Sequence, residues 1–157
     1  MRNCSIILLR LFFSALVILP LLLGGLIYVF FRSIHLIMFK WFESLGFLSP
    51  VLYARHFIAS LHIHFPSWFI FSLPDALWLF SLTLFFGIIW YSGRIAGLLL
   101  LFILSLSFGL FTEFAQYLGI FPGSFDIIDI CFQLLSSFAA IISTHLYYRE
   151  SVCLKNL

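Results

Sequence analysis

The residues best suited to chemistry lie in one polar stretch of an otherwise apolar chain. They are Glu113, Gln116, Asp126, Asp129 and Gln133. The first two are three positions apart, and the last three follow one another at intervals of three and four, so on helices each set shares one face. The residues from Gly119 to Gly123, with Pro122 among them, indicate a turn between the two sets. If the two helices pack as an antiparallel hairpin, three carboxylates and two amides meet in one small volume.

Three interpretations of this acidic cluster remain open. The simplest is structural: Ser124 and Asp126 cap the second helix, whose dipole favours negative charge, and Glu113 lies in interfacial water. In the second, the cluster binds a polar headgroup or a cation, or moves protons, because carboxylates in apolar surroundings need a partner. In the third, two carboxylates act as general acid and base on a lipid. No nucleophile is evident, so this enzymatic interpretation ranks last.

A second polar motif, from Ser72 to Trp78, contains the further candidate Asp75. Pro74 suits the first turn of a helix, and Asp75 suits the positive end of its dipole, so the motif predicts a helix start. The functional alternative is that Asp75 joins the acidic cluster from a third helix, since it falls on the same side of the predicted bundle.

The histidines and cysteines form no recognisable metal motif. His62 and His64 are close in sequence, but a zinc site needs three or four ligands and no cysteine lies near them. The three cysteines are scattered, with neither metal-ligand spacing nor the pattern of a disulfide framework. We therefore predict no metal and no cofactor.

The acidic cluster also carries a resemblance to a known family. Its order of Glu-x-x-Gln, a Pro-Gly turn, Phe-Asp-x-x-Asp and an amide four residues later resembles the VanZ-like family of bacterial membrane proteins. The resemblance is local to this stretch, and the rest of the chain is similar only in its hydropathy layout. It implies a protein of the bacterial cell envelope, with the family's polar positions at Glu113, Gln116, Asp126 and Asp129.

The chain departs from the family pattern at the turn and beyond it. The family's turn arginine is absent, because Gly123 runs directly into Ser124, and Gln133 replaces the family's asparagine. Ser136 and Ser137 stand where the family has glycines, and they are still small enough for close helix packing. The missing arginine removes the obvious partner for a phosphate group.

The composition defines the solvent in which these residues act. Of the 157 residues, 64% are hydrophobic and 9% are charged, whereas a soluble domain is about 25% charged. So few charges could not cover a water-soluble fold, and the bilayer must surround most of the chain. The net charge of +2 offers no basic face, so we predict no nucleic-acid partner. The expected partners are membrane lipids, with other membrane proteins as an alternative.

Charged residues divide the chain into four uncharged stretches. A helix of about 18 residues is roughly 27 Å long and crosses the hydrocarbon core once. We predict one all-α membrane domain over residues 1–157, with four transmembrane helices at about 11–31, 76–93, 95–112 and 130–148. The first stretch exceeds the apolar region of a signal peptide, and no A-x-A-like site follows it, so we expect a permanent anchor.

The segment 33–74 is neither a clean span nor a typical soluble loop, because it mixes apolar residues with charges and four of the five histidines. It predicts two short amphipathic helices, near 34–45 and 51–63, on the outer interface; a re-entrant loop stays open. The positive-inside rule favours two cytoplasmic termini, with five basic residues inside and three outside. Every acidic residue except Glu150 then lies outside.

These patterns predict a VanZ-like membrane protein of the bacterial cytoplasmic membrane that binds or handles a lipid or lipid-linked headgroup at its outer face. The candidate ligand-binding residues are Glu113, Gln116, Asp126, Asp129, Asp75 and Gln133. The alternative is a non-catalytic structural subunit of a larger membrane complex. The bacterial assignment rests on the family resemblance alone.

Overall fold

The computed structural model describes residues 2–120 and 125–156, with side chains for 5–120 and 125–154. In these residues the chain is helical apart from short connections. The helices are α1 (Arg2–Phe31), α2 (Ile37–Ser44), α3 (Leu48–Ser60), α4 (Ser67–Trp90), α5 (Ile95–Tyr117) and α6 (Ile127–Asn156).

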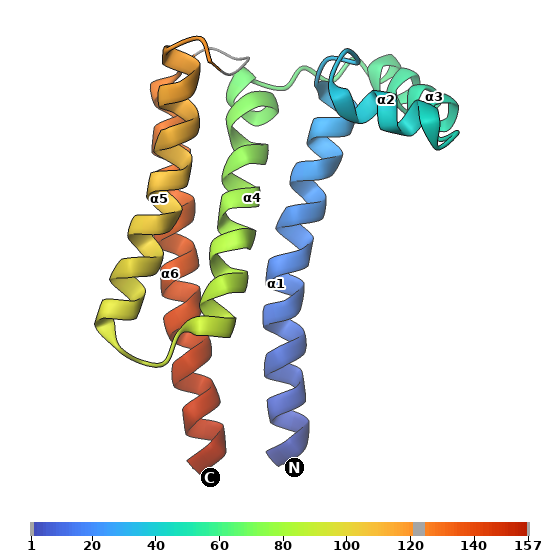
Figure 1. Ribbon diagram of the computed structural model, residues 1–157. Helices are drawn as coiled ribbons and strands as arrows, with labels where there is room; N and C mark the ends of the chain where they lie inside the picture. Colours follow the sequence, from blue (N-terminus) through green and yellow to red (C-terminus); the bar gives the residue numbers. More distant parts are fainter. Residues whose placement is uncertain (1, 121–124, 157) are drawn as a thin grey trace.

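Four of these helices, α1, α4, α5 and α6, are long and apolar enough to cross a membrane. They stand side by side, with the amino end of α1 and the carboxyl end of α6 at one end of the bundle, and the carboxyl end of α5 and the amino end of α6 at the other (Figure 1). Large apolar side chains remain exposed along them, which a bilayer tolerates and water does not. The prediction of an all-α membrane bundle is therefore confirmed.

The four long helices pack around α4 and α6. These two share the most extensive contact, α1 packs mainly against α4, and α5 packs mainly against α6. In the part of the chain that the structure describes, the backbones of α1 and α5 do not approach each other closely. One face of α4 is therefore bordered by α1 on one side and by α5 on the other.

Small and hydroxyl-bearing residues explain why α4, α5 and α6 approach so closely. Gly87 of α4 lies directly against Thr144 of α6, where an added Cβ would come within 2.2 Å of the Thr144 hydroxyl. The Thr83 hydroxyl donates to Ser105 over 2.7 Å, and Ser105 and Ser137 share a hydrogen bond of 2.8 Å. Such contacts drive helix association in membranes, because lipid tails are as apolar as leucine and offer no hydrophobic gain.

Helix α4 begins well before the predicted start. Pro74 is buried inside the helix, so the prediction of a helix start at Pro74 is wrong. The reason is tertiary: the first turns of α4 are aromatic and find partners, since Trp68 stacks on Phe132 of α6 and Phe69 meets Phe31 of α1. Packing of this kind allows a membrane helix to continue through a proline.

Helices α2 and α3 project sideways from the end of α1 (Figure 1). Arg55 of α3 fixes them there, because its guanidinium donates to the backbone carbonyls of Val29 and Arg32 at the carboxyl end of α1. A cation at this position satisfies carbonyls that have no partner within the helix and favours the negative end of the helix dipole. Two short helices thus form in the segment predicted to hold them, and their place on the interface stays a prediction.

Candidate functional site

A cavity of about 1030 Å³ opens on the face of α4 that α1 and α5 border. We call it the α1–α5 cleft. Along most of its length it is lined by apolar residues, of which Leu82, Phe85 and Ile89 of α4 are about half exposed. The cleft is therefore accessible from the bilayer and not sealed inside the bundle.

The charged and amide residues of the cleft gather at one end of the bundle. They are Arg32, which directly follows α1, Asp75 of α4, Glu113 and Gln116 of α5, and Gln133 of α6. The carboxyl ends of α1 and α5 and the amino-terminal parts of α4 and α6 meet at this end (Figure 1). The cleft thus combines a polar end with a long apolar remainder.

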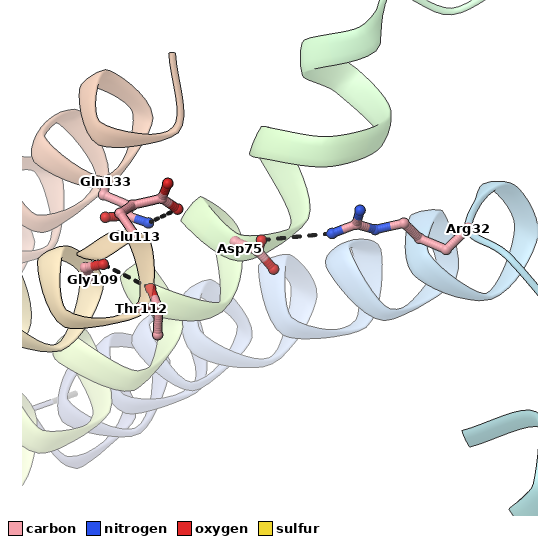
Figure 2. Close-up of polar contacts among 6 residues, drawn as sticks. All are labelled: Arg32, Asp75, Gly109, Thr112, Glu113 and Gln133. Carbon is pink, nitrogen blue, oxygen red and sulfur yellow. Dashed lines mark hydrogen bonds and ion pairs between the residues drawn. The ribbon is translucent and has the colours of Figure 1, made fainter. Parts of the chain in front are cut away.

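Arg32 and Asp75 form an ion pair across α1 and α4, with 3.8 Å between Nη2 and Oδ2 (Figure 2). The guanidinium carbon lies 5.1 Å from the centre of the Tyr28 ring and 4.9 Å from that of the Phe71 ring, distances typical of cation–π contacts. The Nε atom of Arg32 is buried and has no hydrogen-bond partner in the described residues. The long ion pair leaves this guanidinium with unused donor capacity.

Glu113 and Gln133 are the most buried of the charged and amide residues of the cleft, each 4% exposed. Nε2 of Gln133 donates to Oε1 of Glu113 over 3.4 Å, a long and weak hydrogen bond. The backbone N–H of Asp126 also interacts with this carboxylate. Neither Oε2 of Glu113 nor Oε1 of Gln133 has a hydrogen-bond partner among the described residues. Gly109 makes room for the amide, since an added Cβ there would come within 2.5 Å of the Gln133 oxygen.

The two aspartates near the start of α6 lie in different surroundings, although they are only three residues apart. Asp126 is exposed and precedes the helix, and its Oδ1 accepts a hydrogen bond of 2.9 Å from the backbone N–H of Ile128. This is a capping contact outside the cleft. Asp129 is half-buried in the first turn of α6, does not line the cleft, and lies close enough to act electrostatically on both Asp75 and Glu113. Ser124, the other predicted capping residue, lies outside the described residues.

Of the six residues predicted from the sequence, the structure brings Asp75, Glu113, Gln116 and Gln133 to the lining of the cleft. Asp129 and Asp126 do not line it, although the backbone N–H of Asp126 interacts with the Glu113 carboxylate. Arg32 is the charged lining residue that sequence reasoning missed, because a basic residue at the end of a span is ordinarily a flanking charge. Arg32 directly follows α1, and its contact with Asp75 depends on the packing of α1 against α4, so no local pattern in the sequence indicated it.

A metal centre is not assembled from this set. Among the described residues, no three or more His, Cys, Asp or Glu side chains lie close enough together to hold a metal ion. The arrangement can instead hold a polar group that offers both donors and acceptors, because it presents carboxylate and amide oxygens on one side and a guanidinium on the other.

Comparison of the chain with protein-family models, with curated proteins and with solved structures gives no match.

Proposed function

We propose that this membrane protein binds a lipid or lipid-linked molecule in the α1–α5 cleft, with the headgroup at the polar end and the hydrocarbon along the apolar length. The observation that carries the proposal is the shape of the lining: five charged or amide side chains at one end, and half-exposed apolar side chains along α4 beyond them. A volume of about 1030 Å³ lies near the upper end of the range for small-molecule sites, about 300–1,000 Å³.

The polar end supplies the selectivity in this proposal. A hydrocarbon chain that leaves the bilayer for an apolar cleft gains little, because both surroundings are equally apolar. The headgroup gains more, because it meets buried groups that lack partners, above all Oε2 of Glu113. A carboxylate buried in this way is costly until a cation, a donor or a proton satisfies it.

We further propose that the protein is VanZ-like and acts in a bacterial cell envelope, with the polar end of the cleft at the outer face of the cytoplasmic membrane. The resemblance around Glu113 and Gln116 and the distribution of basic residues support this extension. Arg32, directly after α1, would supply the cation that the family's turn arginine supplies elsewhere in the chain. The absence of an arginine from the turn therefore does not argue against a phosphate-bearing ligand.

Native mass spectrometry of gently extracted protein tests the proposal. The variant Leu82→Trp fills the apolar part of the cleft, and Leu104→Trp is its matched control, because Leu104 is similarly exposed on α5 but does not line the cleft. We expect the wild type and Leu104→Trp to retain a defined lipid, and Leu82→Trp to lose it.

A bare chain in all three proteins would contradict lipid binding in the cleft. A bound protein in place of a lipid, retained equally by both variants, would favour a non-catalytic subunit of a larger membrane complex.

A further inference from the structure

The open acceptors of the cleft indicate the chemistry of the group that satisfies them. Oε2 of Glu113 and Oε1 of Gln133 belong to side chains that are 96% buried, both side chains line the cleft, and neither oxygen has a partner among the described residues. A ligand that meets both oxygens must donate at least two hydrogen bonds. A hydroxyl has one donor, whereas a primary ammonium has three.

The charges of the lining also favour a ligand that carries a primary ammonium. Asp75 and Glu113 provide two carboxylates and Arg32 provides one guanidinium, so with all three ionised the described lining carries one excess negative charge. Asp129 adds a second negative charge close behind it. Figure 2 shows Asp75 between the Glu113–Gln133 pair and Arg32, so the negative and positive ends of the site are separated. A ligand that carries a single negative charge would meet repulsion at the Glu113 end.

At the Arg32 end of the site, the ligand must provide a hydrogen-bond acceptor. Nε of Arg32 is buried without a partner, and the Asp75 carboxylate lies beyond hydrogen-bond distance at 3.8 Å. A phosphate oxygen is the acceptor that a guanidinium binds best, and its negative charge balances the cation. The site therefore offers a cation for a phosphate and, on the far side of Asp75, acceptors for an ammonium.

We propose that the α1–α5 cleft selects a phospholipid whose headgroup carries a primary ammonium, as an ethanolamine phospholipid does. The ammonium donates to Glu113 and Gln133, and the phosphodiester accepts from Arg32. This inference rests on the proposed function, since it names the class of lipid that the same cleft binds.

A competition between lipids tests the selection. The protein is equilibrated with equimolar ethanolamine, choline and glycerol phospholipids that have identical acyl chains, and occupancy is measured by native mass spectrometry. These lipids share the phosphate and differ in the terminal group, which is a primary ammonium, a quaternary ammonium without N–H donors, or a neutral diol. We expect the ethanolamine lipid to exceed each of the others by about tenfold, the ratio that corresponds to one charged hydrogen bond.

Two variants test the contacts of the ammonium and of the phosphate separately. Glu113→Gln removes the negative charge and is expected to bring the ethanolamine lipid down to the level of the choline lipid. Arg32→Gln is expected to lower the occupancy of all three lipids, because all three carry the phosphate. Asp126→Asn is the matched control, since Asp126 is an acidic residue outside the cleft and asparagine also caps helices. It should bind as the wild type does.

A competition with soluble phosphoethanolamine distinguishes a lipid ligand from a free headgroup. The soluble molecule carries the same polar groups without acyl chains, so equal displacement at equal concentration would overturn the claim that the ligand is a lipid. Equal occupancy by the three lipids, a preference for the glycerol lipid, or an unchanged preference in Glu113→Gln would overturn the ammonium assignment while leaving lipid binding intact. Absence of any retained lipid would overturn both proposals.

Discussion

The side-chain amide of Gln133 in α6 lies 3.4 Å from the carboxylate of Glu113 in α5, and both groups are almost completely buried. This contact joins two neighbouring helices at the polar end of the cleft, yet it leaves one oxygen of each group without a partner in the described residues. The two residues therefore contribute unequally to stability, because one is a buried charge and the other is its donor.

The contact predicts opposite effects for substitutions of its two members. In lipid-free detergent, Gln133→Leu should destabilise the protein by about 1–3 kcal/mol, because Glu113 loses its side-chain donor while it stays buried. Glu113→Gln should be neutral or stabilising, because it removes a buried charge without changing its shape. Thermal unfolding of each variant measures both effects. A loss of stability in Glu113→Gln as large as that in Gln133→Leu would mean that the charge itself holds the helices together.

The close approach of α4 and α6 depends on Gly87. An added Cβ would come within 2.2 Å of Oγ1 and 2.7 Å of Cγ2 of Thr144, so Gly87→Ala should push the helices apart and cost about 1–3 kcal/mol. Gly97→Ala is the control, because the nearest atom to a Cβ there is 3.6 Å away and alanine fits without a clash. Chemical or thermal unfolding in detergent compares the two.

A second substitution tests the origin of the Gly87 effect. Thr144→Ala removes both clashing atoms, so the double variant Gly87→Ala/Thr144→Ala should recover most of the lost stability. Failure of this rescue would show that the cost arises from another contact of α4.

The hydroxyl chain through Thr83, Ser105 and Ser137 predicts a modest cost on removal of its middle member. Ser105 takes part in both hydrogen bonds, and bonds between membrane helices average about 0.6 kcal/mol each, so Ser105→Ala should cost about 1 kcal/mol. Ser107→Ala on the exposed face of the same helix should change the unfolding free energy by much less. Equal effects of the two variants in an unfolding titration would contradict a structural role for the chain.

The attachment of α2 and α3 to the bundle predicts a local effect of Arg55. Arg55→Gln removes the charged donor to the carboxyl end of α1, so hydrogen exchange of the α3 amides should speed up while that of α4 and α6 stays unchanged. The exposed neighbour His56 provides a control, His56→Gln, which should leave exchange in α3 as it is. Faster exchange throughout the bundle would mean that Arg55 stabilises the whole fold.

The sequence by itself determined the class of structure, because that class depends on local properties. Uncharged stretches long enough to cross a bilayer become α1, α4, α5 and α6, since backbone groups in hydrocarbon must be satisfied within each helix. The polar stretch after Thr112 also indicated that Glu113 and Gln133 could meet, because two consecutive helices with a short connection are expected to pack as an antiparallel pair.

The tertiary structure alone decided which other residues join them. Arg32 and Asp75 lie far apart in the chain and meet because α1 packs against α4, a contact that no local pattern specifies. Asp126 and Asp129 have helical spacing, but α6 begins at Ile127, so the spacing rule does not apply to the residue before it. Local sequence thus predicts which helices form and which residues share their faces, whereas the order in which the helices pack places a guanidinium and two carboxylates in the lining of one cleft.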